Sequence, residues 1–286
     1  MPYETIEVMP LSGSIGAEIR GADLSRTLSE ETFSEIQQAF LDHLVVMLPD
    51  QHLTPPQQIA FARRFGRVMV DPFMKSPAEF PELMIVIKDR HENLAFGEVW
   101  HSDNSYLERP PLGSFLYALE VPSHGGDTLF ANQYLAYETL SPGMRRMLDG
   151  MRAIHNPLSY AQSIASGNFG PHRTMQLRND AVMEHATRIE TEHPVVRTHP
   201  GTGRKALYVN PAYTVRFAGW TEDESRGLLE HLWHHAVRPE FTCRYRWSAG
   251  ALTLWDNRCA MHHPVNDYHG HRRVMHRVTV EGDRPT

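Results

Sequence analysis

The stretch WDNRCAMHHPVNDYHGHRRVMHRVTV, residues 255–280, decides the fold because it carries histidines and arginines within a segment patterned as a strand. Side chains of an extended chain alternate between two faces. One face of the last residues carries Arg273, Met275, Arg277 and Thr279. Arginine keeps its charge and presents a planar fork that suits carboxylate, phosphate or sulfonate. Since buried charges are costly unless neutralised, two arginines on one inward face predict bound anions.

The length and composition of the chain are those of a globular protein. Its 286 residues can form one large domain or two small ones, and 41% are hydrophobic and 22% charged. We find no internal repeat or composition break, so a single domain over residues 1–286 is expected. The net charge of -6 argues against a nucleic-acid partner but leaves a local anion site open.

The first residues, MPYETIEVMPLSG, lack the basic and apolar regions of a signal peptide, and no uncharged apolar run is long enough to span a bilayer. We therefore expect a cytoplasmic protein with no membrane partner. The two cysteines, Cys243 and Cys259, are too few for a disulfide framework and are expected to be small buried residues.

Short strand patterns, separated by turn residues, alternate with a few helical patterns. Helices are expected to begin at Ser29, Thr54 and Thr221, and the last two open capping boxes. Strands are expected as a hairpin within 11–24, at 114–121, on both sides of the turn 200–203, and as a pair, 242–247 with 251–255. This arrangement is typical of a mainly β fold, a sandwich or jelly roll, with flanking helices.

Two long irregular segments are expected to be substrate loops or lids. Residues 67–99 are rich in proline and charge and contain one apolar run at 83–87, while periodicity fades between 155 and 192. Long connections beside a rigid scaffold often carry binding residues, although a plain surface excursion has the same pattern.

The motif WHSDNSY, residues 100–106, predicts a metal site. On an extended chain His101 and Asp103 point the same way, so an imidazole and a carboxylate can bind one ion. A histidine from the closing stretch would complete a two-histidine, one-carboxylate set on Fe(II), which leaves three positions for oxygen and a chelating substrate. Alone, the triplet is a weak signal, because such triplets arise by chance and more often form surface hydrogen bonds. A dicarboxylate chelator would also need an arginine for its far end, and the closing strand offers two.

These motifs together resemble the Fe(II)- and 2-oxoglutarate-dependent dioxygenases of the taurine dioxygenase type, which include alkylsulfatase and aryloxyalkanoate dioxygenase branches. The resemblance runs nearly end to end, through GAEIRGADL, FARRFG, WHSDNSY, HGGDT, GRKALYVN, WDNR and RRVMHR. It implies a cupin-like double-stranded β-helix, or jelly roll. It also implies Fe(II), 2-oxoglutarate and O2 as cofactor and cosubstrates, and a homodimer or homotetramer.

The resemblance also implies roles for individual residues. The iron ligands would be His101, Asp103 and His262, since the family spacing WDNR-x-x-x-His selects His262 over His263. The far carboxylate of 2-oxoglutarate would be held by Arg273 and the hydroxyl of Thr128. Arg277 matches the arginine that meets the anionic group of the primary substrate. Trp255 and Asn257 are expected to pack rather than react.

The reaction implied is hydroxylation of a small anionic substrate, coupled to conversion of 2-oxoglutarate to succinate and CO2. Sulfonates, alkyl sulfates and aryloxyalkanoates are the candidate substrates. Asp71, Met74 and Gly97 stand where taurine-cleaving members carry a histidine, a tyrosine and an asparagine for the taurine amine, so taurine is predicted to be a poor substrate. Tyr213, with Phe73 and Met74, would make the rest of the pocket apolar. Asp71 would either face solvent or receive a substrate amine.

Two alternatives belong to other classes. One is a cupin-like metal enzyme that does not use 2-oxoglutarate, in which Arg273 would have no dicarboxylate partner. The other is a metal-binding β-sandwich without catalysis, for which a full set of anion anchors would have no purpose.

Overall fold

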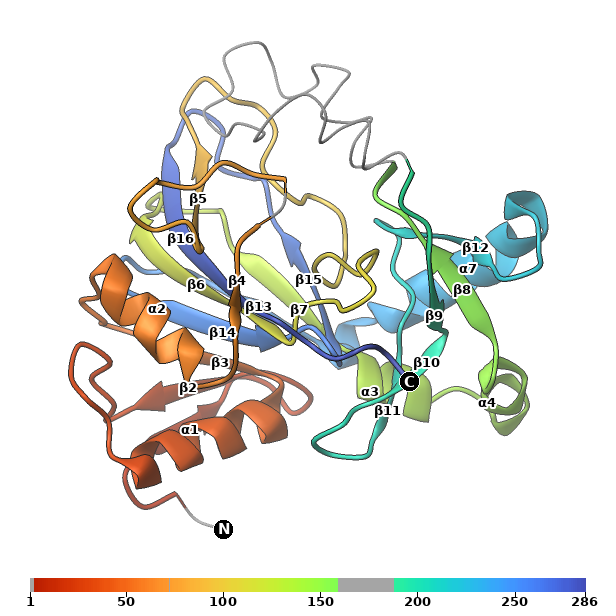
Figure 1. The fold of residues 1–286 in the computed structure, drawn as a ribbon, viewed down its shortest axis with the longest axis horizontal. Helices are drawn as coiled ribbons and strands as arrows, with labels where there is room; N and C mark the ends of the chain where they lie inside the picture. The colour runs from red at the N-terminus through yellow and green to blue at the C-terminus, as the bar shows by residue number, and fades with distance from the viewer. Residues whose placement is uncertain (1–2, 72, 159–187) are drawn as a thin grey trace.

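The computed structural model of the chain describes residues 3–71, 73–158 and 188–286 (Figure 1). Its largest sheet, the main sheet, has the order β1-β2-β3-β14-β6-β16-β4, with β5 also paired to β16. The strands of this sheet are β1 (Glu7–Pro10), β2 (Ala17–Arg20), β3 (Val45–Leu48), β4 (Val68–Met69), β5 (Leu83–Lys88), β6 (Gly113–Glu120), β14 (Leu252–Asp256) and β16 (Arg273–Val280). Neighbouring strands are antiparallel except β2 and β3.

A smaller sheet lies against the inner face of the main sheet. Its order is β13-β7-β15, with β7 (Thr128–Asn132), β13 (Thr242–Tyr245) and β15 (Ala260–Pro264). Side chains from both sheets share one apolar cluster, in which Phe130 and Ala260 of the smaller sheet meet Trp255 and Met275 of the main sheet. The stretch 255–280 therefore serves both sheets, because it leaves β14, forms β15 and returns as β16.

Two helices cover the outer face of the main sheet (Figure 1). They are α1 (Glu30–His43) and α2 (Pro55–Arg63), and they begin as predicted. The Ser29 side chain accepts the backbone N–H of Thr32, and Thr54 forms a capping box with Gln57. Their buried residues pack with Val278 and Val280, which project from β16 on the side opposite Met275. The predicted alternation of β16 is thus confirmed.

The remaining elements form a block beside the two sheets, at the right of Figure 1, around a third apolar cluster. Its sheets have the orders β12-β8-β9 and β10-β11. The elements are α3 (Gln133–Glu138), α4 (Pro142–Leu148), β8 (Arg152–His155), β9 (Thr191–Pro194), β10 (Val196–Thr198), β11 (Lys205–Leu207), β12 (Thr214–Phe217), α7 (Glu222–Ala236) and the 3-10 turn η1 (Pro239–Phe241). The capping box of Thr221 with Glu224 and the strand pair around 200–203 are confirmed.

One predicted strand pair is wrong. Residues 242–247 and 251–255 do not pair with each other, because β13 pairs with β7 in the smaller sheet while β14 pairs with β3 and β6 in the main sheet. The turn at 248–250 carries the chain from one sheet to the other. A turn between two strand patterns looks the same in sequence whether it closes a hairpin or joins two sheets.

The segments expected to be loops are only partly irregular. Within 67–99, β4 and β5 are strands of the main sheet, both paired with β16. Within 155–192, residues 159–187 lie outside the described residues, so the lid role there stays a prediction. The hairpin expected in 11–24 begins earlier, with β1 paired to β2. Within the described residues, we find no helix with the length and apolar character needed to cross a membrane.

Candidate active site

Three of the predicted residues, His101, Asp103 and His262, meet between the two sheets and are buried. His101 and His262 exchange both backbone hydrogen bonds, at 3.0 and 2.8 Å, so their side chains leave the two segments side by side. Asp103 Oδ1 lies 3.5 Å from His101 Nε2 and 3.8 Å from His262 Nε2. One donor atom from each residue lies within 4.8 Å of the others, as a single metal ion requires. We call these residues the His-Asp-His cluster.

Hydrogen bonding and burial leave both histidines able to bind a metal ion through a ring nitrogen. His101 Nδ1 donates to the carbonyl oxygen of Val99 at 2.6 Å, so Nε2 is the ring nitrogen directed at Asp103. Burial lowers the pKa of His262 well below its usual value, and the neighbouring His101 lowers it further. His262 is therefore neutral at pH 7, and a neutral imidazole can bind a metal ion.

Asp103 presents its two oxygens differently. Its Oδ2 forms an ion pair with Arg277 Nη2 at 2.6 Å and receives hydrogen bonds from Ser114 Oγ at 2.8 Å and Trp255 Nε1 at 3.1 Å. Its Oδ1 faces the two histidines. Burial alone would raise the pKa of Asp103, but Arg277 and the histidines outweigh burial and hold the pKa well below its usual value. The carboxylate is therefore ionised, with one oxygen occupied and one directed at the cluster.

Ser114 and Asn257 complete this support. The Ser114 hydroxyl donates to Asp103 and accepts from Arg277 Nη2 at 2.9 Å and from Asn257 Nδ2 at 3.3 Å. Asn257 Oδ1 accepts the backbone N–H of Asp103 and the indole N–H of Trp255, both at 3.1 Å. Trp255 and Asn257, expected only to pack, thus hold a cluster residue directly. Ser114 was missed, because it reads as an ordinary residue at the start of a strand.

Arg273 lies on the inner face of β16, at the end opposite to Arg277. Its side chain is only 6% exposed, and its Nε and Nη2 have no hydrogen-bond partner among the described residues. Its guanidinium carbon lies 5.5 Å from the ring centre of Trp247, whose indole N–H donates to Thr128 Oγ1 at 3.0 Å. Burial lowers the pKa of Arg273, and the nearby Tyr268 only partly offsets this. Trp247 was not singled out from sequence.

A pocket opens beside the His-Asp-His cluster at the Arg277 end. It is lined by Asp71, Phe73, Met74, Phe96, Gly97, His101, Asp103, Asn104, Tyr106, Tyr213 and Arg277. All five residues expected to meet the substrate are on this wall, and Arg273 is not. The rings of Phe73, Tyr106 and Tyr213 form one aromatic side of the pocket. The ring centroid of Tyr106 lies 5.7 Å from that of Phe73 and 5.0 Å from that of Tyr213.

Asp71 and Gly97 have specific positions in that wall. Asp71 Oδ1 accepts the backbone N–H groups of Phe73 at 2.8 Å and Met74 at 2.7 Å, so its carboxylate folds back on its own turn at the pocket wall. Gly97 has a φ of +80°, and a Cβ there would lie 3.0 Å from Cε1 of His101. A side chain at position 97 would therefore press on the cluster, which explains glycine at this place.

A second buried cluster contains His199, Asp256 and Cys259. Here both carboxylate oxygens of Asp256 are bound by Arg258, and His199 Nε2 lies 3.0 Å from Asp256 Oδ2. His199 Nδ1 accepts two backbone N–H groups. Because the His199 nitrogens and the Asp256 oxygens already have hydrogen-bond partners, we infer that this cluster stabilises the fold and does not bind a metal ion. Cys243 and Cys259 are buried free thiols, as expected.

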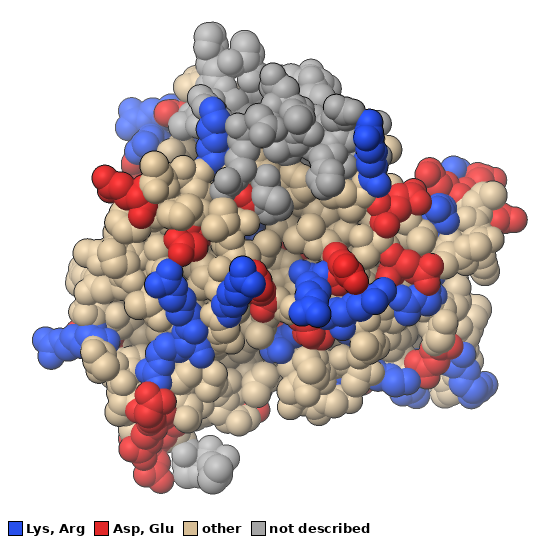
Figure 2. Space-filling view, viewed as in Figure 1, with Lys and Arg blue, Asp and Glu red and all other residues tan. Residues whose placement is uncertain are grey.

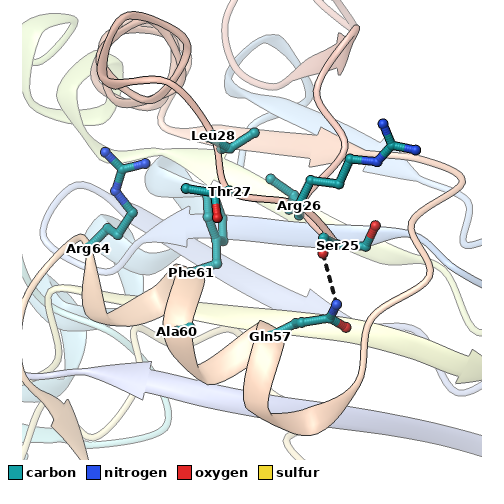
Figure 3. Close-up of a pocket in the computed structure, with 9 residues that line it drawn as sticks. Ser25, Arg26, Thr27, Leu28, Gln57, Ala60, Phe61 and Arg64 are labelled. Atoms are coloured by element: carbon teal, nitrogen blue, oxygen red, sulfur yellow. Dashed lines mark hydrogen bonds between the residues drawn. The ribbon is translucent and has the colours of Figure 1, made fainter.

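Two surface features lie away from this site. A hollow between α2 and the loop 24–28 is flanked by Arg26 and Arg64, and Gln57 donates across it to the carbonyl of Ser25 at 2.9 Å (Figure 3). The two arginines pair with Asp23 and Glu30. On the face in Figure 2, basic and acidic side chains lie beside one another rather than gathering by sign.

Two buried histidines and one buried carboxylate that converge between β-sheets are typical of a mononuclear non-haem iron site. The model of the family "Taurine catabolism dioxygenase TauD, TfdA family" matches residues 7–279. The chain belongs to this family of 2-oxoglutarate-dependent dioxygenases, which confirms the enzyme class and the use of Fe(II), 2-oxoglutarate and O2.

Similar proteins extend over the full length of the chain. An alkylsulfatase from Acinetobacter baylyi is 34% identical over 100% of this chain and 88% of its own length. A sulfate ester dioxygenase from Pseudomonas putida is 34% identical over 98% of this chain and 91% of its own. The crystal structure of a taurine dioxygenase from Burkholderia xenovorans is 36% identical, with a TM-score of 0.81 over 99% of this chain and 93% of its own.

Proposed function

We propose that the chain hydroxylates a small anionic organic substrate of the sulfonate, alkyl sulfate or aryloxyalkanoate type, using O2 and 2-oxoglutarate and releasing succinate and CO2. The observation that carries this proposal is the His-Asp-His cluster, of which His101 and Asp103 line the same pocket as Arg277. The aromatic side of the pocket suits an apolar alkyl or aryl body, while Arg277 suits an anionic end. We also propose that the two facing sheets form a double-stranded β-helix, the jelly roll of cupin-like proteins.

In this proposal iron would be held by His101 Nε2, His262 Nε2 and Asp103 Oδ1. When bound, iron would supply the activation of O2 and the oxidation of a substrate C–H bond. The ion pair with Arg277 and the hydrogen bonds from Ser114 and Trp255 keep Oδ2 of Asp103 occupied, so that Asp103 offers a single oxygen. The donor set fits the ion because the two imidazoles and the carboxylate converge, and His262 is neutral.

The far carboxylate of 2-oxoglutarate would be held by Arg273 and Thr128. The fit rests on the buried Nε and Nη2 of Arg273, which have no partner among the described residues, and on the neighbouring Thr128 hydroxyl. An uncompensated buried guanidinium is costly, and a carboxylate ligand removes that cost. A metal enzyme that uses no dicarboxylate would have no need of this arrangement.

Substrate binding would use Arg277 with Tyr213, Met74, Gly97 and Asp71. For an alkyl sulfate R–CH2–OSO3⁻, the net reaction adds one oxygen atom to give R–CH(OH)–OSO3⁻, while the second oxygen atom enters succinate. The hydroxylated carbon then expels sulfate and leaves an aldehyde. Taurine is proposed to be a poor substrate, since Gly97 offers no side chain to its amine and Asp71 Oδ1 is already bonded to two backbone N–H groups.

A succinate-release screen tests the proposal. Purified protein with Fe(II), ascorbate and 2-oxoglutarate would be given alkyl sulfates, sulfonates, aryloxyacetates, aryloxypropionates and taurine under air. We expect succinate in proportion to product for one of the first four classes and little for taurine. Anaerobic addition of Fe(II) and 2-oxoglutarate should give a weak visible charge-transfer band. Absence of that band would favour a metal enzyme that does not use 2-oxoglutarate. If the protein did not bind a metal ion at all, both the dioxygenase and that alternative enzyme would be excluded.

A further inference from the structure

Lys88 ends β5 directly opposite Arg273, the first residue of β16. Residues that oppose each other in paired strands project from the same face, so Lys88 and Arg273 are neighbours on the inner face. The same ladder places Val86 opposite Met275 and Met84 opposite Arg277. Lys88 therefore belongs to the Arg273 end of the face, and it is not among the residues that line the pocket at the Arg277 end.

Lys88 is unusual because it is a buried cation. The residue is only 3% exposed, and its Nζ has no hydrogen-bond partner among the described residues. Glu92 and Glu98 act to raise its pKa, but no ion pair of Lys88 is found in the described part of the chain. Burial lowers its pKa. Leaving a buried ammonium group without a partner is costly, so the site is built for something that compensates it.

The surroundings of Lys88 and of Arg273 are shared. Lys88 Nζ lies over the ring of Tyr268 at 4.5 Å from its centre, and Tyr268 also acts on the pKa of Arg273. Tyr268 packs against Gly126, where an added Cβ would lie 3.3 Å from its ring. Gly126 is two residues before Thr128. Two buried cations with unpartnered nitrogens, a tyrosine and the Thr128 hydroxyl thus converge on one region.

We propose that Lys88 is a second cationic contact for the far carboxylate of 2-oxoglutarate, beside Arg273 and Thr128. The inference rests on the proposed role of Arg273. A carboxylate has about four lone-pair sites, of which Arg273 can fill two and the Thr128 hydroxyl one, so one remains for an ammonium group. This assignment gives a partner to each of the buried nitrogens, Arg273 Nε, Arg273 Nη2 and Lys88 Nζ.

Calorimetric titration of the Mn(II)-loaded protein with 2-oxoglutarate and with pyruvate tests the proposal. Pyruvate has the keto acid group that chelates the metal but lacks the far carboxylate. We expect Lys88→Met to weaken 2-oxoglutarate binding about 10- to 100-fold, the usual effect of losing one charge-assisted hydrogen bond, and to leave pyruvate binding unchanged. Lys88→Arg, which keeps the charge, should recover most of the affinity.

Controls separate a contact from a loss of structure. Lys205→Met removes an exposed lysine of β11 that pairs with Asp149. This variant should bind both ligands as the wild-type protein does. Lys88→Gln, a polar uncharged variant, serves if Lys88→Met does not fold. Wild-type affinity for 2-oxoglutarate in a folded, uncharged Lys88 variant would overturn the inference, as would equal weakening of 2-oxoglutarate and pyruvate. Failure of the wild-type Mn(II) protein to bind 2-oxoglutarate would instead overturn the proposed function, and this inference with it.

Discussion

Arg273 and Arg277 lie four residues apart on the inner face of one strand, yet they differ in their partners. Both are buried, at 6% and 8% exposure. Arg277 Nη2 binds Asp103 at 2.6 Å and Ser114 at 2.9 Å, whereas Nε and Nη2 of Arg273 have no partner in the described chain. Burial acts against the charge of both. Asp103 nevertheless raises the pKa of Arg277, while the pKa of Arg273 is lowered.

Two arginines in the same sequence pattern can therefore differ in whether the protein or a ligand supplies their partner. Arg277 is already part of the framework that holds Asp103, so a substrate anion would join an existing network. Two nitrogens of Arg273, Nε and Nη2, lack a partner among the described residues, and in our proposal a ligand supplies one. Substitution of Arg277 should therefore lower the stability of the metal-free protein, whereas substitution of Arg273 should lower only the affinity for 2-oxoglutarate.

The largest effect on activity is expected from substitutions in the His-Asp-His cluster, whose Asp103 pairs with Arg277. Asp103→Ala and His262→Ala should each reduce succinate release more than about 1,000-fold, since the oxidation needs the metal. Mn(II) binding, followed by electron paramagnetic resonance, should be lost in parallel. His263→Ala is the matched control, because His263 stacks on Trp100 and not on the cluster. An equal loss at His263 would show that the wrong histidine has been assigned.

Arg277→Met should destabilise the metal-free protein by about 3 kcal/mol at pH 7, because it leaves a buried carboxylate without its cation. The folded-state pKa of Asp103 is well below its unfolded value of about 3.9. The Asp103–Arg277 pair therefore contributes its full stabilisation of the fold above about pH 3.9, and this stabilisation is lost as the pH falls through the folded-state pKa. The cost of Arg277→Met should therefore shrink below about pH 4, as measured by urea unfolding at several pH values. A cost that grows with acidity would break the assignment of this ion pair.

Arg273→Met should behave in the opposite way. It removes an uncompensated buried cation, so the stability of the metal-free protein should change little. Affinity for 2-oxoglutarate in the Mn(II) protein should fall about 100-fold, since two charge-assisted hydrogen bonds are lost. Arg272→Met is the matched control, because the adjacent Arg272 pairs with Glu120 outside the site. If Arg273→Met lost stability but bound 2-oxoglutarate normally, the contrast between the two arginines would be refuted.

The comparison also separates what sequence can and cannot predict. Alternation along one strand placed both arginines on one face, and capping boxes fixed the starts of α2 and α7, because these features depend on residues close in the chain. The partners of the arginines are not local. Ser114 and Lys88 reach β16 from neighbouring strands, and the wrong pairing of 242–247 with 251–255 has the same origin. No periodicity records which strand lies next to which.

The smallest effect, and the sharpest test of the Arg277 end, is expected at Ser114. Its hydroxyl both donates to Asp103 and accepts from Arg277, so Ser114→Ala removes one of the three donors to Oδ2 and leaves the ion pair in place. Loss of such a supporting contact typically weakens metal binding about 10-fold. Ser102→Ala is a matched control, since the buried Ser102 hydroxyl donates to the carbonyl of Ala260 and not to Asp103.

Mn(II) affinity and the Co(II) visible spectrum would be measured for both serine variants and for Ser114→Thr, which keeps the hydroxyl. We expect Ser114→Ala alone to bind Mn(II) more weakly and to alter the Co(II) bands, because the Asp103 carboxylate loses one of its three contacts at Oδ2 and is oriented less firmly toward the ion. Ser114→Thr should restore the wild-type spectrum. If Ser114→Ala and Ser102→Ala lost affinity equally, the effect would come from packing around the cluster. The orientation of Asp103 would then depend on Arg277 and Trp255 without Ser114.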